Sequence, residues 1–174
     1  MMYLQDLRSE AGENMDRIDK ILKHNLFLEN LQKIEAAEAD RCFCRHDMVH
    51  FLDVARIGMI MSLEEKLEIP REWIYGAALL HDIGKHRQYE EGIPHEQASA
   101  SIAPEILSDC GFDEKETDVI IEAVLQHRNS EVISEKNLRG LLYRADKASR
   151  PCFACKAEGE CNWKGSKKNL KIIY

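Results

Sequence analysis

The stretch Leu79-Leu80-His81-Asp82-Ile83-Gly84-Lys85 ends an apolar run that we expect to form a short helix over residues 73–81. Apolar residues recur with helical spacing along most of the chain, and no sustained alternation typical of strands competes with them. The sequence therefore predicts an all-α fold. An imidazole beside a carboxylate at the end of a rigid helix can also bind one metal ion, because both groups suit Zn²⁺, Fe and Mn²⁺.

The same spacing predicts further helices over residues 16–23, 26–39, 46–66, 95–107, 113–127 and 135–148. Pro70 reads as a helix start, and Gly84 and Gly92 as breaks in the helical pattern. The composition changes after Pro151, where a short cysteine-rich tail with several lysines follows. We expect one domain over residues 1–174, with its core at 26–150 and the tail at 151–174.

The charge balance limits the classes of partner. The 174 residues carry 24 Lys and Arg against 31 Asp and Glu, a net charge of −7, which disfavours general nucleic-acid binding through the phosphate backbone. A small phosphorylated substrate is compatible, because a metal would supply local positive charge. No stretch has the features of a signal peptide or a membrane span, so we expect a cytoplasmic protein with reduced cysteines.

Four more residues, each in or beside a predicted helix, are candidate ligands for the metal: His50, His95, His127 and Asp146. Each has an alternative interpretation. A histidine is often a satisfied core residue or matches the dipole of a helix end, and Asp146 has Arg144 and Lys147 close by in sequence as ion-pair partners. A buried carboxylate without a partner would be costly, however, and this favours a metal at Asp82.

The order of these residues resembles the HD superfamily of metal-dependent phosphohydrolases. The resemblance implies an HD-domain helical bundle in which Asp82 bridges two metal ions. His95 and His127 resemble the additional ligands of the two-metal branch, and the layout is most similar to the small bacterial YqeK-type proteins, which cleave dinucleoside polyphosphates. The implied metal ligands are His50, His81, Asp82, His95, His127 and Asp146.

Two divalent ions (Fe, Mn, Zn or Mg) would explain hydrolysis without a protein nucleophile, because a hydroxide held between them can attack phosphorus. We therefore predict a phosphohydrolase that cleaves a phosphoester or phosphoanhydride of a nucleotide-like substrate, with Asp82 and Lys85 as the catalytic residues. The residues predicted to contact substrate are Lys85, Arg45, His46 and Arg128. A di-iron oxygenase acting on a small polar organic substrate and a regulatory binding module stay open as alternatives, as does the formation of a homodimer.

The cysteines of the tail predict a possible second metal site. Cys152, Cys155 and Cys161 would supply three thiolates, and a Cys-x-x-Cys pair is a good clamp for zinc or an iron centre. Three ligands are one short of a closed site, and Cys42 or Cys44 would complete it if the tail folds back. The alternative is a tail of reduced thiols that packs over the domain.

Overall fold

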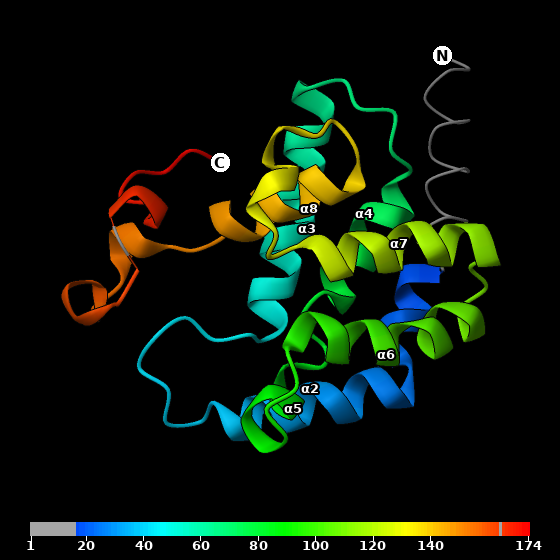
Figure 1. The fold of residues 1–174 in the computed structure, drawn as a ribbon, viewed down its shortest axis with the longest axis horizontal. Helices are drawn as coiled ribbons and strands as arrows, with labels where there is room; N and C mark the ends of the chain where they lie inside the picture. The colour runs from blue at the N-terminus through cyan, green and yellow to red at the C-terminus, as the bar shows by residue number, and fades with distance from the viewer. Residues whose placement is uncertain (1–16, 164) are drawn as a thin grey trace, which may run out of the picture.

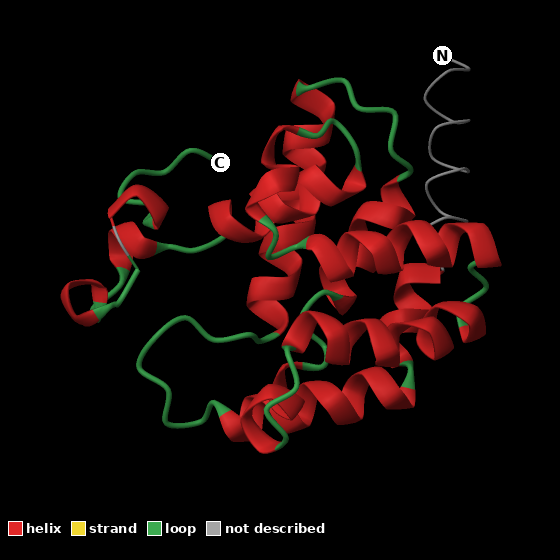
Figure 2. Cartoon of the chain, in the orientation of Figure 1, coloured by secondary structure: helices red, strands yellow, loops and turns green. Residues whose placement is uncertain are grey.

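The computed structural model describes residues 17–163 and 165–174, and these residues form helices and loops without a strand (Figure 2). Residues 17–23 are helical. They are followed by α2 (Asn25–Ala37), α3 (Met48–Glu64), α4 (Arg71–Leu80), α5 (Lys85–Glu90), α6 (His95–Asp109), α7 (Glu114–Gln126) and α8 (Leu138–Ala148). Short 3₁₀ helices occupy Ser130–Ser134, Cys152–Ala154, Glu158–Glu160 and Gly165–Lys167. The predicted all-α class is confirmed.

Capping residues explain two boundaries that the sequence placed wrongly. The helix predicted from residue 46 begins at Met48, because the side chain of Asp47 accepts a hydrogen bond from the backbone N–H of His50. The helix predicted from residue 135 begins at Leu138, because Asn137 caps it in the same way. Helix α5 was missed altogether, and Asp16, the predicted start of the first helix, lies outside the described residues.

Helix α4 lies at the centre of the bundle and packs against α3, α6, α7 and α8 (Figure 1). Its second half is buried, and Leu79 and Leu80 have no exposed surface. Burying a leucine side chain contributes about 1.5–3 kcal/mol. The His81-Asp82 pair is therefore delivered into the interior by a firmly anchored helix.

Gly84, the residue before α5, lets the turn that follows α4 approach α6 closely. A Cβ atom on Gly84 would lie 2.4 Å from the backbone nitrogen of Ser99 and 2.7 Å from the Cβ of Ala98. The backbone N–H of Gly84 also donates to Ser99 Oγ at 2.9 Å. The sequence indicated only a break in the helical pattern at this glycine. In the structure, Gly84 packs directly against α6, the helix that carries His95.

The cysteine-rich tail leaves the end of α8 and extends along one side of the bundle (Figure 1). The side-chain amide of Asn169 donates to the backbone carbonyls of Lys147, Ala148 and Arg150 at 2.7, 3.1 and 2.9 Å. The last carbonyls of a helix have no partners within the helix. One asparagine therefore ties the tail to α8.

Within residues 17–163 and 165–174, no helix combines the length and apolar character needed to cross a bilayer.

Glu116 on α7 joins three elements of the fold. Its carboxylate accepts hydrogen bonds from Arg17 at 2.8 and 3.0 Å and from the Trp73 indole at 3.0 Å. It also completes the capping box of α7 with Asp113. The Arg17 guanidinium lowers the pKa of Glu116 to about 2.

We expect Glu116→Gln to lower the free energy of unfolding at pH 7 by about 1–3 kcal/mol, because the charge-assisted bonds to Arg17 are lost. The folded-state pKa lies below the ordinary value of 4.5. The stabilising effect is thus complete above pH 4.5 and disappears as the pH falls toward 2. Urea unfolding of both proteins across this pH range measures the difference, and a difference independent of pH would contradict the assignment.

Candidate metal centre

His81 and Asp82 follow directly after α4 and are almost fully buried, with exposures of 0% and 2%. The Nδ1 atom of His81 lies 2.7 Å from the backbone oxygen of Ala78, which can only accept a hydrogen bond. The proton of the neutral ring therefore sits on Nδ1, and Nε2 presents a lone pair. This tautomer allows His81 to bind a metal ion through Nε2.

A first triad consists of His50, His81 and Asp82, whose ligand atoms all lie within 4.8 Å of one another. His50 Nε2 is 3.3 Å from His81 Nε2 and 3.8 Å from Asp82 Oδ2. The other ring nitrogen of His50 lies 3.3 Å from Ser149 Oγ, whose own proton goes to the backbone oxygen of Asp146. The His50 lone pair at Nε2 therefore also faces the carboxylate.

A second triad consists of Asp82, His95 and His127. His95 Nε2 and His127 Nε2 lie 3.1 and 3.5 Å from Asp82 Oδ1, and 3.2 Å from each other. The Nδ1 of His127 faces the Val124 carbonyl at 2.6 Å, and that of His95 faces Gln88 Oε1 at 2.5 Å. The Val124 carbonyl again directs the lone pair of His127 Nε2 toward Asp82. His95 Nδ1 faces both Gln88 Oε1 and, at 3.1 Å, the Lys85 ammonium, so an acceptor alone does not fix its tautomer.

The two triads share Asp82, one through each carboxylate oxygen. Among residues 17–163 and 165–174, no hydrogen-bond donor reaches its buried Oδ1 atom. Lone pairs of ring nitrogens and a carboxylate oxygen repel each other at these distances unless a cation lies between them. The donor set of four imidazoles and a shared carboxylate therefore fits divalent metal ions, and the site is suited to two of them.

Asp146 joins the first triad from α8. Its Oδ1 lies 3.6 Å from His50 Nε2 and 4.0 Å from His81 Nε2. It also forms ion pairs with Lys147 and, at 3.4 Å, with Arg150. Asp146 thus lies beside the first triad and also forms the ion pair with Lys147 that the sequence offered as an alternative. Arg144, the other alternative partner, pairs with Glu65.

Electrostatic coupling keeps the carboxylates ionised and His95 neutral. Burial by itself would raise the pKa of Asp82, but the surrounding imidazoles, led by His81, hold it well below its usual range. Burial likewise opposes the ionisation of Asp146, and Lys147 and Arg150 lower its pKa in spite of it. Burial lowers the pKa of His95 to about 3. Although burial opposes it, Asp82 and Asp146 raise the pKa of His81, so this ring would release its proton when it binds metal.

Lys85 lies at the edge of the second triad. Its Nζ is 3.1 Å from His95 Nδ1 and 3.4 Å from Gln88 Oε1, and the residue is 8% exposed. Burial lowers the pKa of this ammonium group. The structure therefore brings Lys85 to the site, as predicted, although on the new helix α5 rather than on a continuation of α4.

His46 also lies at the site. Its Nε2 is 3.6 Å from Asp82 Oδ2, and its Nδ1 is 2.6 Å from Glu38 Oε1. Glu38 additionally accepts a hydrogen bond from the Tyr89 hydroxyl at 2.5 Å. Glu38 was missed by the sequence reasoning, because a glutamate at the end of a helix gives no signal that it is buried.

Two predicted arginines have different surroundings. Arg45 donates to the backbone oxygen of Ala39 at 2.8 Å and is exposed, so its guanidinium group is held within its own loop and not at the triads. Arg128 follows His127 directly, is about half exposed and pairs with Glu96 at 3.1 Å. Sequence spacing could have revealed Arg150, because it lies one helical turn after Asp146.

The HD domain family matches the chain over residues 48–154, which include both triads and Asp146. The chain belongs to this family. HD domains are in general metal-dependent hydrolases, so the metal-binding fit of the triads agrees with the family. The similarity to the YqeK-type branch is not confirmed by this match.

A protein from Clostridium beijerinckii, described as uncharacterized, is 46% identical to this HD domain protein over 160 residues. The aligned region covers 92% of the chain and 100% of the relative. No solved structure matches the chain.

Removing the shared carboxylate should empty both triads, whereas removing one outer histidine should empty only one. Not counting metal bound by cysteines, we expect about two metal equivalents in the wild type, near zero in Asp82→Asn, and about one in His50→Ala or His127→Ala. Metal analysis of the purified proteins provides the measurement, with circular dichroism to verify folding. His24→Asn is the matched control, since His24 lies outside both triads and asparagine can replace it as a helix cap. Retention of two equivalents in Asp82→Asn would contradict the bridging role.

Gly84→Ala should push α6 and His95 away from Asp82. Overpacking of this kind costs about 1–3 kcal/mol of stability, and metal loss should be confined to the His95 and His127 triad. Gly159→Ala is the control, because a Cβ there meets nothing within 4 Å. Thermal unfolding and metal analysis of both variants test the prediction, which fails if the two substitutions have equal effects.

Proposed function

We propose that this HD domain protein is a two-metal phosphohydrolase that cleaves a phosphoester or phosphoanhydride bond in a nucleotide-like substrate. One observation supports the nucleotide in particular. A cavity of about 990 Å³ beside the triads is lined by several cations, and no acidic side chain lines it among the described residues. In a chain with a net charge of −7, such a cavity selects for an anion.

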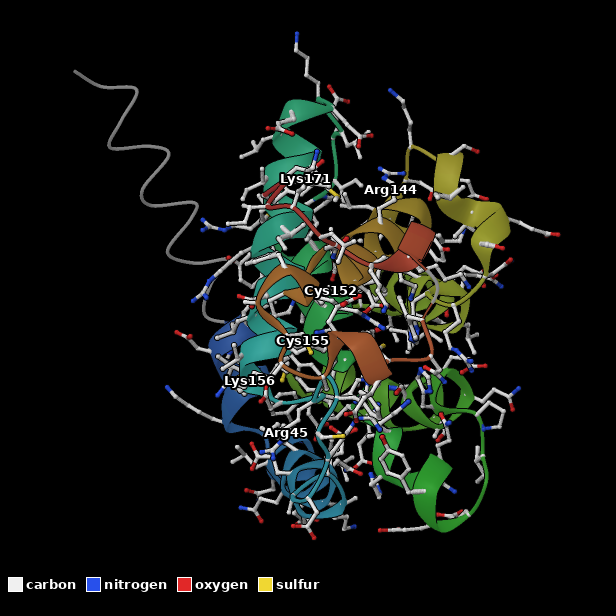
Figure 3. The ribbon with its side chains drawn as sticks, turned by 90° about the vertical axis from the view of Figure 1, so that its left-hand side faces the viewer. Arg45, Arg144, Cys152, Cys155, Lys156 and Lys171 are labelled. Carbon is white, nitrogen blue, oxygen red and sulfur yellow. The ribbon has the colours of Figure 1, made fainter. Side chains whose placement is uncertain are left out.

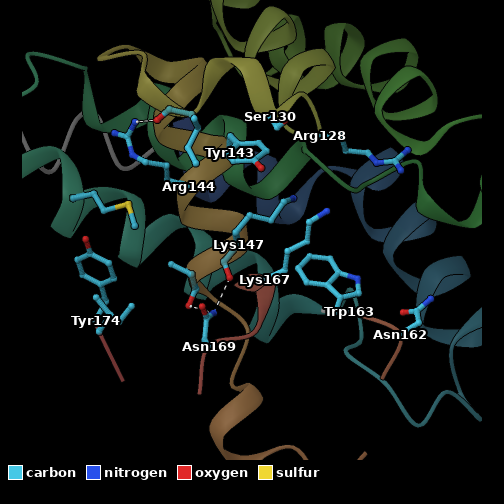
Figure 4. A pocket seen from close by; sticks show the side chains of 14 residues that line it. Arg128, Ser130, Tyr143, Arg144, Lys147, Asn162, Trp163, Lys167, Asn169 and Tyr174 are labelled. Carbon is cyan, nitrogen blue, oxygen red and sulfur yellow. Dashed lines mark hydrogen bonds between the residues drawn. The ribbon is translucent and has the colours of Figure 1, made fainter. Parts of the chain in front are cut away.

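The cavity lies between α8 and the tail (Figure 4). Its cations are Arg128, Arg144, Lys147 and Lys167, and its polar residues include Asn162 and Asn169. Its volume falls in the range of small-molecule sites, about 300–1,000 Å³. A nucleotide with several phosphates fits both this size and this charge.

Two lining residues connect the cavity to the metal centre. Lys147 is adjacent to Asp146 and pairs with its carboxylate, while Arg128 is adjacent to His127. A phosphate chain bound by these cations would enter the site from the side of Asp146 and His127. The other end of the substrate would then lie toward the tail.

Aromatic residues also line the cavity. Trp163 is partly exposed, and the Arg150 guanidinium covers its ring at 3.9 Å from the centroid. Tyr143 lies on α8, with Lys147 Nζ 5.1 Å from its ring centroid. Stacking of a nucleobase on an aromatic ring contributes about 1–3 kcal/mol. Trp163 is the proposed platform for the base.

When bound, two divalent ions would lower the pKa of a water molecule and neutralise charge on the phosphate oxygens. The side chains perform the remaining tasks. Asp82 and the four imidazoles define the position of the reacting phosphate, and Lys85 and Arg128 supply positive charge beside it. His46, oriented by Glu38, faces the same carboxylate and is a proposed substrate contact.

The proposal is tested by phosphate release from a panel of adenosine mono-, di- and triphosphate and diadenosine tetraphosphate, with oxygen consumption followed in parallel. We expect release with Mn²⁺ or Fe²⁺ added and at least a hundredfold loss in Asp82→Asn, since metal catalysis commonly supplies several kcal/mol. A dinucleoside polyphosphate as best substrate would support the YqeK-type similarity. Oxygen consumption without phosphate release would replace the proposal by the di-iron oxygenase, which the same ligands suit.

Trp163→Ala should raise KM for a nucleotide about 5- to 100-fold, the equivalent of one lost stacking interaction. The KM of the Trp163→Ala variant for inorganic tripolyphosphate should not change, because this substrate has no base. Phe153→Ala is the matched control, since Phe153 is an exposed aromatic of the tail outside the cavity. Equal effects on both substrates would argue against base stacking.

A further inference from the structure

Four cysteines from distant parts of the chain lie on the same side of the bundle. Cys44 belongs to the loop between α2 and α3, and Cys152, Cys155 and Cys161 belong to the tail. The loop and the tail extend along the same side of the helices (Figure 1), and Figure 3 shows Cys152 and Cys155 on the face that also carries the loop residue Arg45. The tail folds back toward the loop. The two segments are far apart in the sequence, so the fold brings them together.

Three of the cysteines line a hollow. A cavity of about 320 Å³ is lined by Cys44, Cys152 and Cys161, together with Arg41, Arg150 and Glu160. Cys155, three residues after Cys152, does not line the cavity, but it is near enough to Cys44 for the two thiols to interact electrostatically. Cys42 is exposed and does not line the cavity. Of the two candidates for the fourth ligand in the loop, the structure therefore favours Cys44.

The spacing of the sulfur atoms distinguishes between kinds of metal centre. A tetrahedral zinc site with Zn–S bonds of about 2.3 Å requires its sulfurs within about 4 Å of each other. Among the described residues, no three cysteines bring their sulfurs within 4.8 Å of one another. An iron–sulfur cluster contains several metal and sulfide atoms, so its four cysteines stand around a cavity rather than around a point.

The surroundings supply positive charge for such a group. Arg41 donates through Nε to the backbone oxygen of Cys44 at 2.8 Å, which holds this cation beside the cavity. The Nε atom of Arg150, which lines the cavity, is buried without a hydrogen-bond acceptor. Lys168 interacts electrostatically with Cys152 and Cys161. Cluster sulfur atoms accept hydrogen bonds, and nearby donors adjust their electronic properties.

We propose that Cys44, Cys152, Cys155 and Cys161 bind an iron–sulfur cluster, assembled from iron and sulfide, at the junction of the loop and the tail. Each thiol releases its proton when it binds iron. The site is separate from the triads, and three of its four cysteines lie outside residues 48–154, the part of the chain that matches the HD domain family. It would join the loop that carries His46 to the tail that carries Trp163, and so hold both against the metal centre.

The test is iron and acid-labile sulfide analysis of the full chain purified without oxygen, before and after reconstitution with ferrous and ferric iron and sulfide. We expect sulfide together with a broad visible absorption band in the wild type. Cys44→Ser, Cys152→Ser and Cys155→Ser should each lose the sulfide to background. Acid-labile sulfide is present only in a cluster, so iron bound by the triads does not interfere with this reading.

Two control variants separate the proposed site from other causes. Cys42→Ser should keep the wild-type sulfide content, and Asp82→Asn should keep its sulfide while losing the metal of the triads. Circular dichroism and the triad metal content verify that each cysteine variant is folded. The proposal is overturned by absence of sulfide after reconstitution, by zinc bound through the cysteines without sulfide, or by loss of sulfide in Cys42→Ser equal to that in Cys44→Ser.

Discussion

The buried carboxylate of Asp82 is the group around which the helices are arranged. An ionised side chain in the interior is costly unless opposite charge or hydrogen bonds compensate for it. Here four imidazoles from α3, the end of α4, α6 and the end of α7 converge on its two oxygens. Backbone carbonyls bind the other ring nitrogens of His81 and His127 and leave their Nε2 lone pairs facing the carboxylate, so the compensation that this geometry favours is a cation.

The packing of the fold serves this arrangement. Helix α4 is surrounded by other helices, which places the His81-Asp82 pair inside the bundle, and Gly84 allows α6 to bring His95 up to it. The cations Lys85, Lys147 and Arg150 form a partial shell around the acidic centre. Negative charge is thus concentrated at the ligands, while positive charge lines the adjoining cavity. This segregation is compatible with the phosphorylated substrate that we propose.

The loop before α3 and the tail after α8 are two segments that neither the helical bundle nor the triads require. The loop carries His46 to Asp82, and the tail contributes Trp163, Lys167 and Asn169 to the cavity beside α8. Short-range bonds hold both in place, with Arg41 acting within the loop and Asn169 joining the tail to α8. Segments with so few buried apolar side chains gain much from a metal centre that links them, because such a centre limits their conformational freedom.

Helical periodicity was sufficient to predict the all-α class and most helices, because these depend on local spacing along the chain. The full set of candidate ligands was implied by the resemblance of the residue order to the HD superfamily. Other features depended on packing. Asp82 is shared by two triads, and Cys44 rather than Cys42 lines the tail cavity, because segments far apart in sequence meet there. The hydrogen bond from His46 to Glu38 and the bond that keeps Arg45 within its loop also depend on how the chain folds. No local pattern encodes such contacts, since they are set by how whole helices and loops fill space around the buried charge.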